Sequence, residues 1–279
     1  MTVELDIGRR TDIGRRREHN EDCLGIYHHP EYPDEIETRG TLLIVADGMG
    51  GYAAGEIASR TAVEAVLNSY YGDLSDGMSD GLTRAVRYAN RAVIDEANRD
   101  AERAGMGTTL ALAVVWAGQL AVANVGDSRV YLIRDGRIAQ ISRDHSWIAE
   151  LLAVGKITPE EARRHPMRNV VTRSLGGRPD LDIEVYPPLK LRRGDIALVC
   201  SDGLWGMVSA EQMLQTVESR SAQAAADALV AAANVAGGHD NITAIVCRVV
   251  SAADEDANDQ TIQMDALRLQ DTQPIPILP

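Results

Sequence analysis

The sequence predicts an α+β fold with a core of two antiparallel sheets and helices packed outside it. Three observations indicate this class. Short apolar runs with strand character recur from residue 3 to residue 249, turn signals separate them, and two pairs of helical stretches interrupt the series. With 279 residues, of which 45% are hydrophobic, the chain is long enough to bury a sizeable core.

The strand-like segments are short and mostly apolar. The first alternates apolar and polar residues around Val3, Leu5 and Ile7, as a half-buried strand does. Further runs cover residues 23–27, 41–46, 109–116, 120–125, 130–133, 196–200 and 242–249. Turns such as Asp135-Gly136 join several of them through connections of hairpin length, which indicates antiparallel pairing.

Two pairs of helical stretches lie between these strands. The first pair follows the run at 41–46. In its second member, apolar residues recur at helical spacing, namely Leu82, Val86, Ala89, Val93 and Ala97. The late pair covers residues 210–217 and 222–235. Residues 144–182 form a less regular insert with several Gly and Pro breakers, which is either a surface excursion or a flap near a site.

Composition excludes several classes of protein. A formal net charge of −13 argues against nucleic-acid binding, which needs clustered Lys and Arg. The three cysteines include no CxxC pair, so neither a disulfide framework nor a thiolate zinc site is expected. Residues 1–10 lack the apolar core of a secretion signal, and the longest apolar run, residues 110–117, is too short for a membrane span. We therefore expect a cytoplasmic protein without a membrane partner.

One pattern returns along the chain: an apolar strand that runs into Asp, usually with Gly alongside. Asp47 and Asp202 follow such strands and precede Gly, Asp127 follows Gly126, and Asp240 opens the last strand. A single Asp-Gly pair is usually a turn. Strand ends cluster at the rims of a two-sheet core, however, so several of these carboxylates are expected to converge. Converging carboxylates repel one another unless a cation is present, and oxygen ligands favour magnesium or manganese over zinc.

The N-terminal part of the chain adds a guanidinium and two carboxylates, those of Arg17, Glu21 and Asp22. An arginine can clamp a phosphate through two parallel hydrogen bonds. The alternative is a plain exposed basic stretch, because Arg15, Arg16 and Arg17 are adjacent. The local sequence leaves both interpretations open.

A series of short motifs occurs in order along the chain. They are Thr11-Asp12-Ile13-Gly14 with Arg17-x-x-Asn20-Glu21-Asp22, Ala46-Asp47-Gly48-Met49-Gly50-Gly51, Gly107-Thr108-Thr109, Gly126-Asp127-Ser128-Arg129, Ser201-Asp202-Gly203 and Asp240-Asn241-Ile242-Thr243. In this order they resemble the motifs of the type 2C metal-dependent protein phosphatases, most closely the bacterial serine/threonine branch. The resemblance covers about residues 4–250.

The resemblance implies a four-layer αββα sandwich, in which helices flank two antiparallel sheets and a flap at about residues 144–182 covers the site. It implies a catalytic domain at residues 1–250. Residues 251–279 are acidic and are expected to form a disordered tail.

The same resemblance implies a metal centre. Asp47 would bridge two divalent metal ions, manganese or magnesium, and the Gly48 carbonyl would bind one of them while Asp202 and Asp240 hold the other. Two metals close together lower the pKa of a shared water and stabilise the attacking and leaving oxygens. Hydroxide would then attack phosphorus in line, with no phosphoenzyme intermediate.

The remaining site residues are implied in the same way. Asp22 would support the metal pair directly or through water, with Glu21 beside it. Arg17 would orient the substrate phosphate. Asp127 and Asp202 would form a third, looser metal site.

Two residues depart from the family pattern. Many eukaryotic relatives have a His at the position of Met49, and this His is proposed as the general acid. Bacterial members often have Met there, as this chain does, so the general acid is unassigned. Gly206 stands where relatives often carry an acidic residue that helps to bind a third metal ion, which leaves the third site open.

Other phosphatase classes are excluded. A cysteine-dependent phosphatase needs Arg six residues after its Cys, and those positions hold His29, Gly206 and Ala253. The nearest match to a DxDx[TV] aspartyl-phosphate motif, Asp180-Leu181-Asp182-Ile183-Glu184, lacks the hydroxyl residue, and no P-loop sequence occurs.

We therefore expect a monomeric enzyme that hydrolyses phosphoserine and phosphothreonine in proteins and opposes a serine/threonine kinase. The alternative is a non-catalytic member of the same fold that binds phosphoproteins as a regulator. The presence of all four main metal ligands, Asp22, Asp47, Asp202 and Asp240, favours catalysis.

Overall fold

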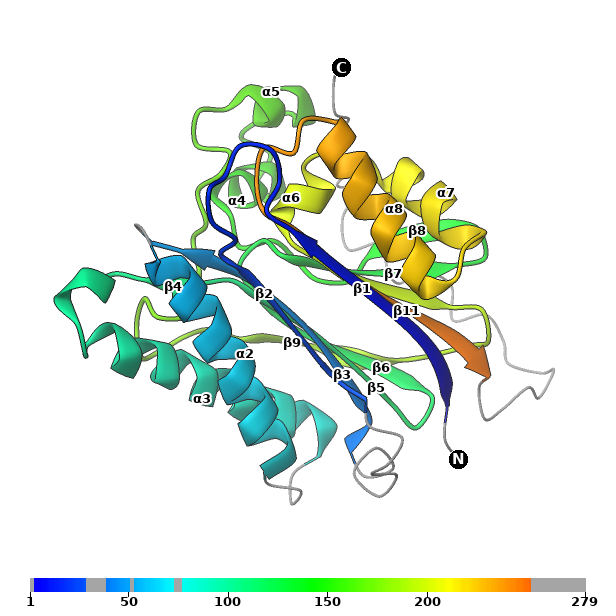
Figure 1. Cartoon of the computed structure of the whole chain (residues 1–279), viewed down its shortest axis with the longest axis horizontal. Helices are drawn as coiled ribbons and strands as arrows, with labels where there is room; N and C mark the ends of the chain where they lie inside the picture. Colours follow the sequence, from blue (N-terminus) through cyan, green and yellow to red (C-terminus); the bar gives the residue numbers. More distant parts are fainter. Residues whose placement is uncertain (1–2, 29–38, 51–52, 73–76, 252–279) are drawn as a thin grey trace.

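The computed structural model describes residues 3–28, 39–50, 53–72 and 77–251. Two antiparallel sheets stack face to face with helices on both outer faces, which confirms the predicted four-layer α+β sandwich (Figure 1). Of the tail expected at residues 251–279, Ser251 is the last residue of a strand, and residues 252–279 lie outside the described residues. None of the helices within these ranges has the length and apolarity that a bilayer crossing demands.

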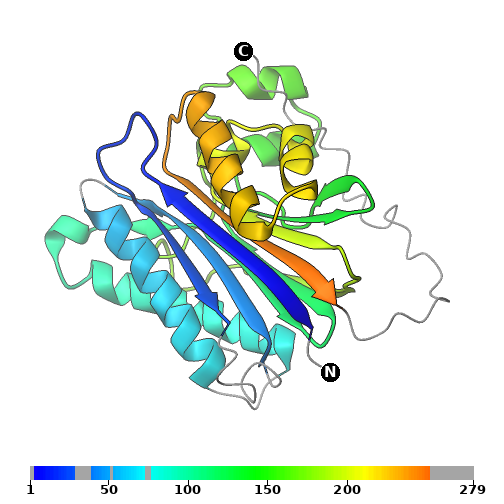
Figure 2. The same ribbon diagram turned by 45° about the vertical axis from the view of Figure 1, so that its right-hand side comes forward.

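The first sheet has the strand order β1-β11-β10-β7-β8, and every pairing in it is antiparallel. Its strands are β1 (Glu4–Asp12), β11 (Ile242–Ser251), β10 (Ile196–Cys200), β7 (Arg129–Arg134) and β8 (Arg137–Gln140). Helix α8 (Ala222–Val235) packs on β1 and β11, and α7 (Ala210–Glu218) packs on β8 (Figure 2). Both helices lie close to the bounds that the sequence predicts.

The second sheet has the strand order β2-β3-β5-β6-β9, with β4 paired to β3. Its strands are β2 (Asp22–Tyr27), β3 (Thr41–Met49), β4 (Gly107–Thr108), β5 (Leu110–Trp116), β6 (Gln119–Val125) and β9 (Glu184–Lys190). Helix α2 (Ala54–Gly72) covers β2 and β3, while α3 (Met78–Ala97) covers β6 and β9.

Strand β3 shows how one apolar run serves two cores. Leu42, Ile44 and Ala46 pack into the core beneath α2 and α3, whereas Leu43 and Val45 pack between the two sheets. None of the five side chains is exposed to solvent. Successive side chains of a strand point to opposite faces, so a continuous apolar sequence fits a strand that is covered on both sides.

Residues 144–182, the less regular insert of the sequence analysis, hold two short helices, α4 (Trp147–Ala153) and α5 (Pro159–Arg164). Each begins at a side-chain cap. The Ser146 hydroxyl accepts from the Ala149 N–H at 3.3 Å, and Thr158 forms a capping box with Glu161. In Figure 1 this segment stands beyond the ends of the strands.

The structure adds elements that the sequence analysis does not predict. They are β4, β8, β9, the 3-10 turn η1 (Ala101–Arg103) and α6 (Asp202–Trp205). Strand β3 also continues through Asp47 and Gly48 to Met49, because β4 pairs with its last residues. Asp47-Gly48 is therefore strand and not a turn. Asp135-Gly136, by contrast, is the turn between β7 and β8, with φ of 51° and 68°.

Candidate metal centre at the rim of the sheets

The predicted site residues meet at one rim of the sandwich. Asp22 opens β2 and stands directly opposite Asp47 of β3, as Cα partners in the ladder. Asp202 begins α6 at the end of β10, and Asp240 lies just before β11. Asp127 lies between β6 and β7. Five segments far apart in the sequence thus deliver carboxylates to the same end of the molecule, as the sequence analysis expects.

The facing pair, Asp22 and Asp47, lies among several carboxylates that have little contact with solvent. The Ser201 hydroxyl donates to Asp22 Oδ2 at 2.7 Å, and Asp22 as a residue is only 8% exposed. Burial raises the pKa of Asp22 to about 7, and hydrogen bonds from Thr243 and Ser201 only partly oppose this shift. Burial, followed by repulsion from Asp22 and Asp202, also holds the pKa of Asp47 well above its usual value.

Asp202 and Asp127 continue the cluster. Burial and the negative charge of Asp240 raise the pKa of Asp202 to about 6. Burial, together with the charges of Asp202 and Asp144, holds the pKa of Asp127 well above its usual value. These shifts share one cause: several carboxyl groups are removed from water and lie near one another without enough positive charge to compensate them.

The chemistry of this donor set fits divalent cations. Asp22 Oδ1 and Asp202 Oδ1 are buried and accept no hydrogen bond within the described residues. Oxygen-only donor sets of this kind suit magnesium or manganese. Among the described residues, no three or more His, Cys, Asp or Glu side chains are oriented so that they could hold a metal ion together. Two of the carboxylates are engaged by neighbouring groups: Asp22 Oδ2 accepts from Ser201, and Asp240 Oδ2 accepts from Arg17.

Arg17 accounts for one of those contacts. Its Nη2 donates to Asp240 Oδ2 at 2.7 Å, and the two side chains remain 47% and 30% exposed. Glu21 lies beside this pair, and burial raises the pKa of its carboxyl group. The structure therefore brings the predicted phosphate-binding arginine to the carboxylates, where it already neutralises one of them.

Gly48 is confined by its neighbours. Its N–H donates to the Glu21 carbonyl at 3.1 Å, which ties the end of β3 to the segment before β2. A Cβ at Gly48 would lie 2.1 Å from the Gly55 carbonyl oxygen. Any side chain at position 48 would therefore push α2 away from the strand that carries Asp47.

Two further polar residues, Asn241 and Thr109, support the segments that carry the carboxylates. Asn241 holds the β1–β2 connection, because its Nδ2 donates to the carbonyls of Ile13 and His19 while its Oδ1 accepts from the Glu21 N–H. The Thr109 hydroxyl accepts from the Asp47 N–H at 3.0 Å. Their signal in the sequence is position: each belongs to one of the short motifs that occur in order along the chain.

A second network fixes the Asp127 segment. The Arg129 guanidinium makes a bidentate ion pair with Asp144 at 2.9 and 2.6 Å and lies 3.5 Å from the centre of the Trp205 ring. Trp205 Nε1 donates to the Asp127 carbonyl at 2.9 Å, and Arg129 Nη1 donates to the Tyr131 hydroxyl. The network joins β7, α6 and the start of residues 144–182.

Without bound cations, the melting temperature of the chain is expected to fall as the pH rises from about 4 to about 7. The folded-state pKa values of Asp22 and Asp202, about 7 and about 6, exceed the usual 3.8. A carboxyl group with a raised folded-state pKa stabilises the fold below its unfolded-state pKa, and this stability is lost as the pH rises through the folded-state value. Thermal melts in EDTA at several pH values measure the effect. The double variant Asp22→Asn/Asp202→Asn should flatten the profile, and an unchanged slope in that variant would contradict the assignment.

Comparison with known proteins places the chain in a family. The family model described as protein phosphatase 2C matches residues 34–235. A serine/threonine phosphatase, stp, of Listeria welshimeri is 37% identical over 244 residues, which span 85% of this chain and 93% of that protein. The PstP phosphatase of Mycobacterium tuberculosis is 37% identical over 254 residues, which span 90% of this chain but 46% of that protein.

Solved structures agree with this relationship. The crystal structure of Mycobacterium tuberculosis PstP superposes with a TM-score of 0.78 at 35% identity, covering 88% of this chain and 98% of that one. A PstP catalytic domain in complex with two manganese ions gives a TM-score of 0.77 at 34% identity, covering 90% and 100%. The chain belongs to the protein phosphatase 2C family.

Proposed function

We propose that the chain is a serine/threonine protein phosphatase that hydrolyses phosphoserine and phosphothreonine with the help of two divalent cations, manganese or magnesium. The observation that carries the proposal is the convergence of Asp22, Asp47, Asp127, Asp202 and Asp240 at one rim, where burial and mutual repulsion raise the pKa values of four of them. Such a cluster lacks positive charge, and a divalent metal pair supplies it. Family membership and the two manganese ions of the related PstP domain support the same conclusion.

The residues that would hold the cations follow from their places at the rim. Asp47 lies at the centre, because the charges of all four other carboxylates act on it. We assign to it the bridging position between two cations, with the Gly48 carbonyl beside it. Asp202 and Asp240 would complete the site of the second cation. Asp240 must turn away from Arg17 to do so, since one of its oxygens now accepts from that guanidinium.

The other rim residues have supporting roles in this proposal. Asp22 has one buried oxygen without a hydrogen-bond partner and would bind the cation pair directly or through water. Glu21 would add negative charge at the edge of the metal site. Asp127 would contribute to a third, looser site with Asp202. Arg17, half-exposed at the mouth, would bind the substrate phosphate and orient it. The cations, when bound, activate a water molecule and stabilise the charge that develops on the phosphate oxygens.

The wider setting of the enzyme belongs to the same proposal. Because its substrates are phosphorylated hydroxyl side chains, the chain would oppose a serine/threonine kinase in the cytoplasm, acting as a monomer with its catalytic domain at residues 1–250. The second candidate is a phosphoprotein-binding regulator of the same fold. Catalysis is favoured because every carboxylate that a metal pair requires is present and directed to one rim.

Hydrolysis of p-nitrophenyl phosphate and of a phosphothreonine peptide should require added manganese or magnesium, fall to background in excess EDTA, and return when manganese exceeds the chelator. The physical reason is that the rim residues alone cannot neutralise the charge on the phosphate oxygens. Phosphate release measures the reaction. Turnover that continues in excess chelator would contradict the proposal, and peptide binding without any hydrolysis would favour the regulator.

A further inference from the structure

Positive charge gathers around the site although the chain is acidic. The formal net charge is −13, yet residues 162–178 contain five arginines and no Asp or Glu. Residues 13–20, the connection from β1 to β2, contain three arginines and one acidic residue. Figures 1 and 2 show both segments beyond the same ends of the sheets, where the carboxylate rim lies.

Backbone hydrogen bonds hold the first of these segments next to the rim. Leu175 and Thr108 exchange backbone hydrogen bonds at 2.9 and 3.1 Å, and the Thr108 hydroxyl donates to the Asp47 carbonyl. Further along, the Thr172 N–H donates to the carbonyl of His145, whose own N–H donates to the carbonyl of Gly126, the residue before Asp127. The basic segment is thus attached on the side of Asp47 and Asp127.

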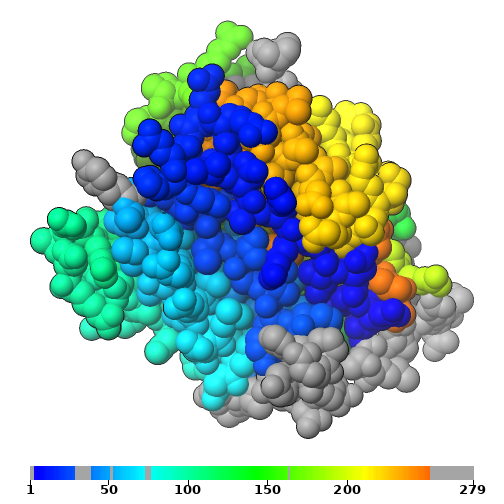
Figure 3. Space-filling model, viewed as in Figure 1, coloured from blue at the N-terminus to red at the C-terminus, as the bar shows by residue number. Residues whose placement is uncertain are grey.

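The second segment borders the rim near Asp240. The Arg15 N–H donates to the Gly238 carbonyl at 2.7 Å, and Asn241 binds the backbone of Ile13 and His19. The space-filling view shows this N-terminal segment, in blue, at the surface at that end of the molecule (Figure 3). The two basic segments therefore border the carboxylates from different elements.

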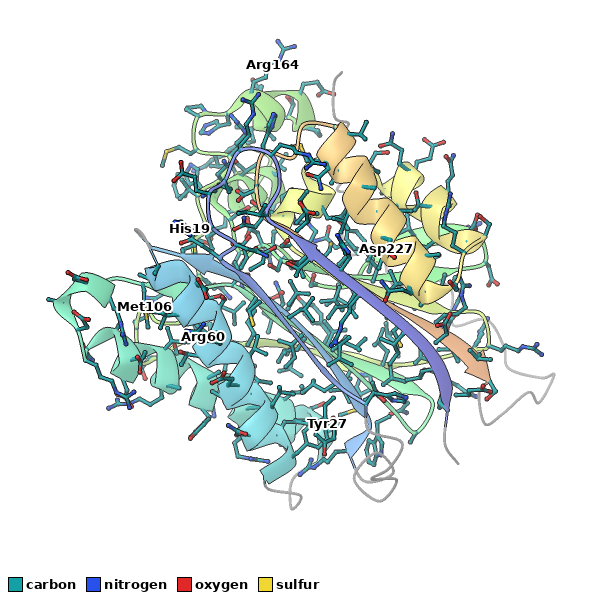
Figure 4. All side chains as sticks on the ribbon, viewed as in Figure 1. His19, Tyr27, Arg60, Met106, Arg164 and Asp227 are labelled. Carbon is teal, nitrogen blue, oxygen red and sulfur yellow. The ribbon has the colours of Figure 1, made fainter. Side chains whose placement is uncertain are left out.

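Four guanidinium groups on these segments are available to a ligand. Arg15, Arg16, Arg164 and Arg168 are exposed, and none of them forms an ion pair within the described residues. Arg164 projects outward from α5 (Figure 4). Arg129 differs from these four arginines, because its guanidinium is largely buried and forms an ion pair with Asp144.

We infer that these four arginines bind acidic residues that flank the phosphorylated Ser or Thr of a substrate. The inference rests on the proposed function and adds to it a class of substrate: phosphoproteins with Asp or Glu near the phosphate. Guanidinium groups pair with carboxylates through planar, two-pronged hydrogen bonds. The negative charge of the rest of the surface opposes such a substrate only weakly, because exposed charges are screened beyond about 8 Å at physiological ionic strength.

The test uses three phosphothreonine peptides that are identical except for flanking residues, which are Glu, Ala or Lys. We expect kcat/KM to be highest with Glu and lowest with Lys, with steps of about three- to tenfold that shrink in high salt. Fluorescence anisotropy on the same peptides should give the same order of affinity, which tests the inference without catalysis. Equal values for the three peptides, or a preference for Lys, would overturn it.

Two double variants test whether the basic segments cause the preference for acidic peptides. Arg164→Ala/Arg168→Ala should reduce kcat/KM for the Glu peptide about three- to tenfold while leaving hydrolysis of p-nitrophenyl phosphate unchanged. The matched control Arg87→Ala/Arg91→Ala removes the same charge from the exposed face of α3 and should leave both substrates unaffected. Equal losses in the two variants would refute the assigned surface. Failure of the wild-type chain to hydrolyse p-nitrophenyl phosphate would instead refute the proposed function.

Discussion

Asp47→Asn should lower kcat for phosphate-ester hydrolysis by about a thousandfold or more while the chain stays folded. The carboxylate of Asp47 is the one on which the charges of Asp22, Asp127, Asp202 and Asp240 all act, so it is the centre of the cluster. An amide of the same shape keeps the packing but removes the charge that would bridge two cations. Several kcal/mol of charge stabilisation at the phosphate depend on that bridge, and about 1.4 kcal/mol corresponds to a factor of ten in rate.

The same substitution should not destabilise the metal-free chain, because it removes one of several repelling buried charges. The measurements are steady-state hydrolysis with saturating manganese, and a thermal melt in EDTA. Asp227→Asn is the control, since Asp227 is exposed on α8 and lies away from the rim (Figure 4). Turnover within tenfold of the wild-type rate would rule out a bridging role for Asp47.

Arg129→Ala should lower the free energy of unfolding by about 3–5 kcal/mol, which is the loss expected when one partner of a buried ion pair is removed. Arg129 and Asp144 are 16% and 10% exposed, so the variant leaves a carboxylate with little water and no partner. Burial alone would lower the pKa of Arg129, but the charge of Asp144, the neighbouring Tyr131 and the hydrogen bonds to both residues together raise it. The Trp205 ring also loses the guanidinium that stacks on it.

Urea denaturation of the metal-free chain measures this loss. Arg91→Ala is a suitable comparison, because its pair with Asp95 is 66% and 49% exposed and should contribute less than about 1 kcal/mol. The double variant Arg129→Met/Asp144→Leu should recover part of the loss by removing both charges together. A cost below about 1 kcal/mol for Arg129→Ala would show that the network is not a stabilising element.

Much of the fold follows from patterns within single segments. Strand β3 and helix α8 are predicted well because each carries a strong local signal: an unbroken apolar run, or Ala and Leu at helical spacing after a Ser cap. Strand β9 escapes prediction because Pro187 and Pro188 interrupt it. They are tolerated only because β9 is the edge strand of its sheet. Strand β8 has four half-buried or exposed residues and no distinctive pattern.

The site, like the fold, can be predicted from the sequence only in part. That the carboxylates converge can be predicted, since each stands at the end of an apolar strand and strand ends meet at rims. The pairing of Asp22 with Asp47 cannot be predicted, because the register between β2 and β3 depends on packing across the sheet. Contacts such as Arg129 with Asp144, or Trp205 with the Asp127 carbonyl, join different elements, and no local pattern indicates which partners will meet.

The pairing of the first strand with the last has a consequence for how the chain reaches its native state. Glu4 pairs with Ser251 and Asp12 with Ile242, so β1 gains its sheet partner only after nearly all the described residues have been synthesised. Arg17 and Asp240 meet across the same long separation. Loop closure of this length is slow, and contacts that depend on it form late. A nascent chain that ends before β11 can complete the second sheet but neither the first sheet nor the rim, so it would carry no assembled site until Asp240 and β11 have been synthesised.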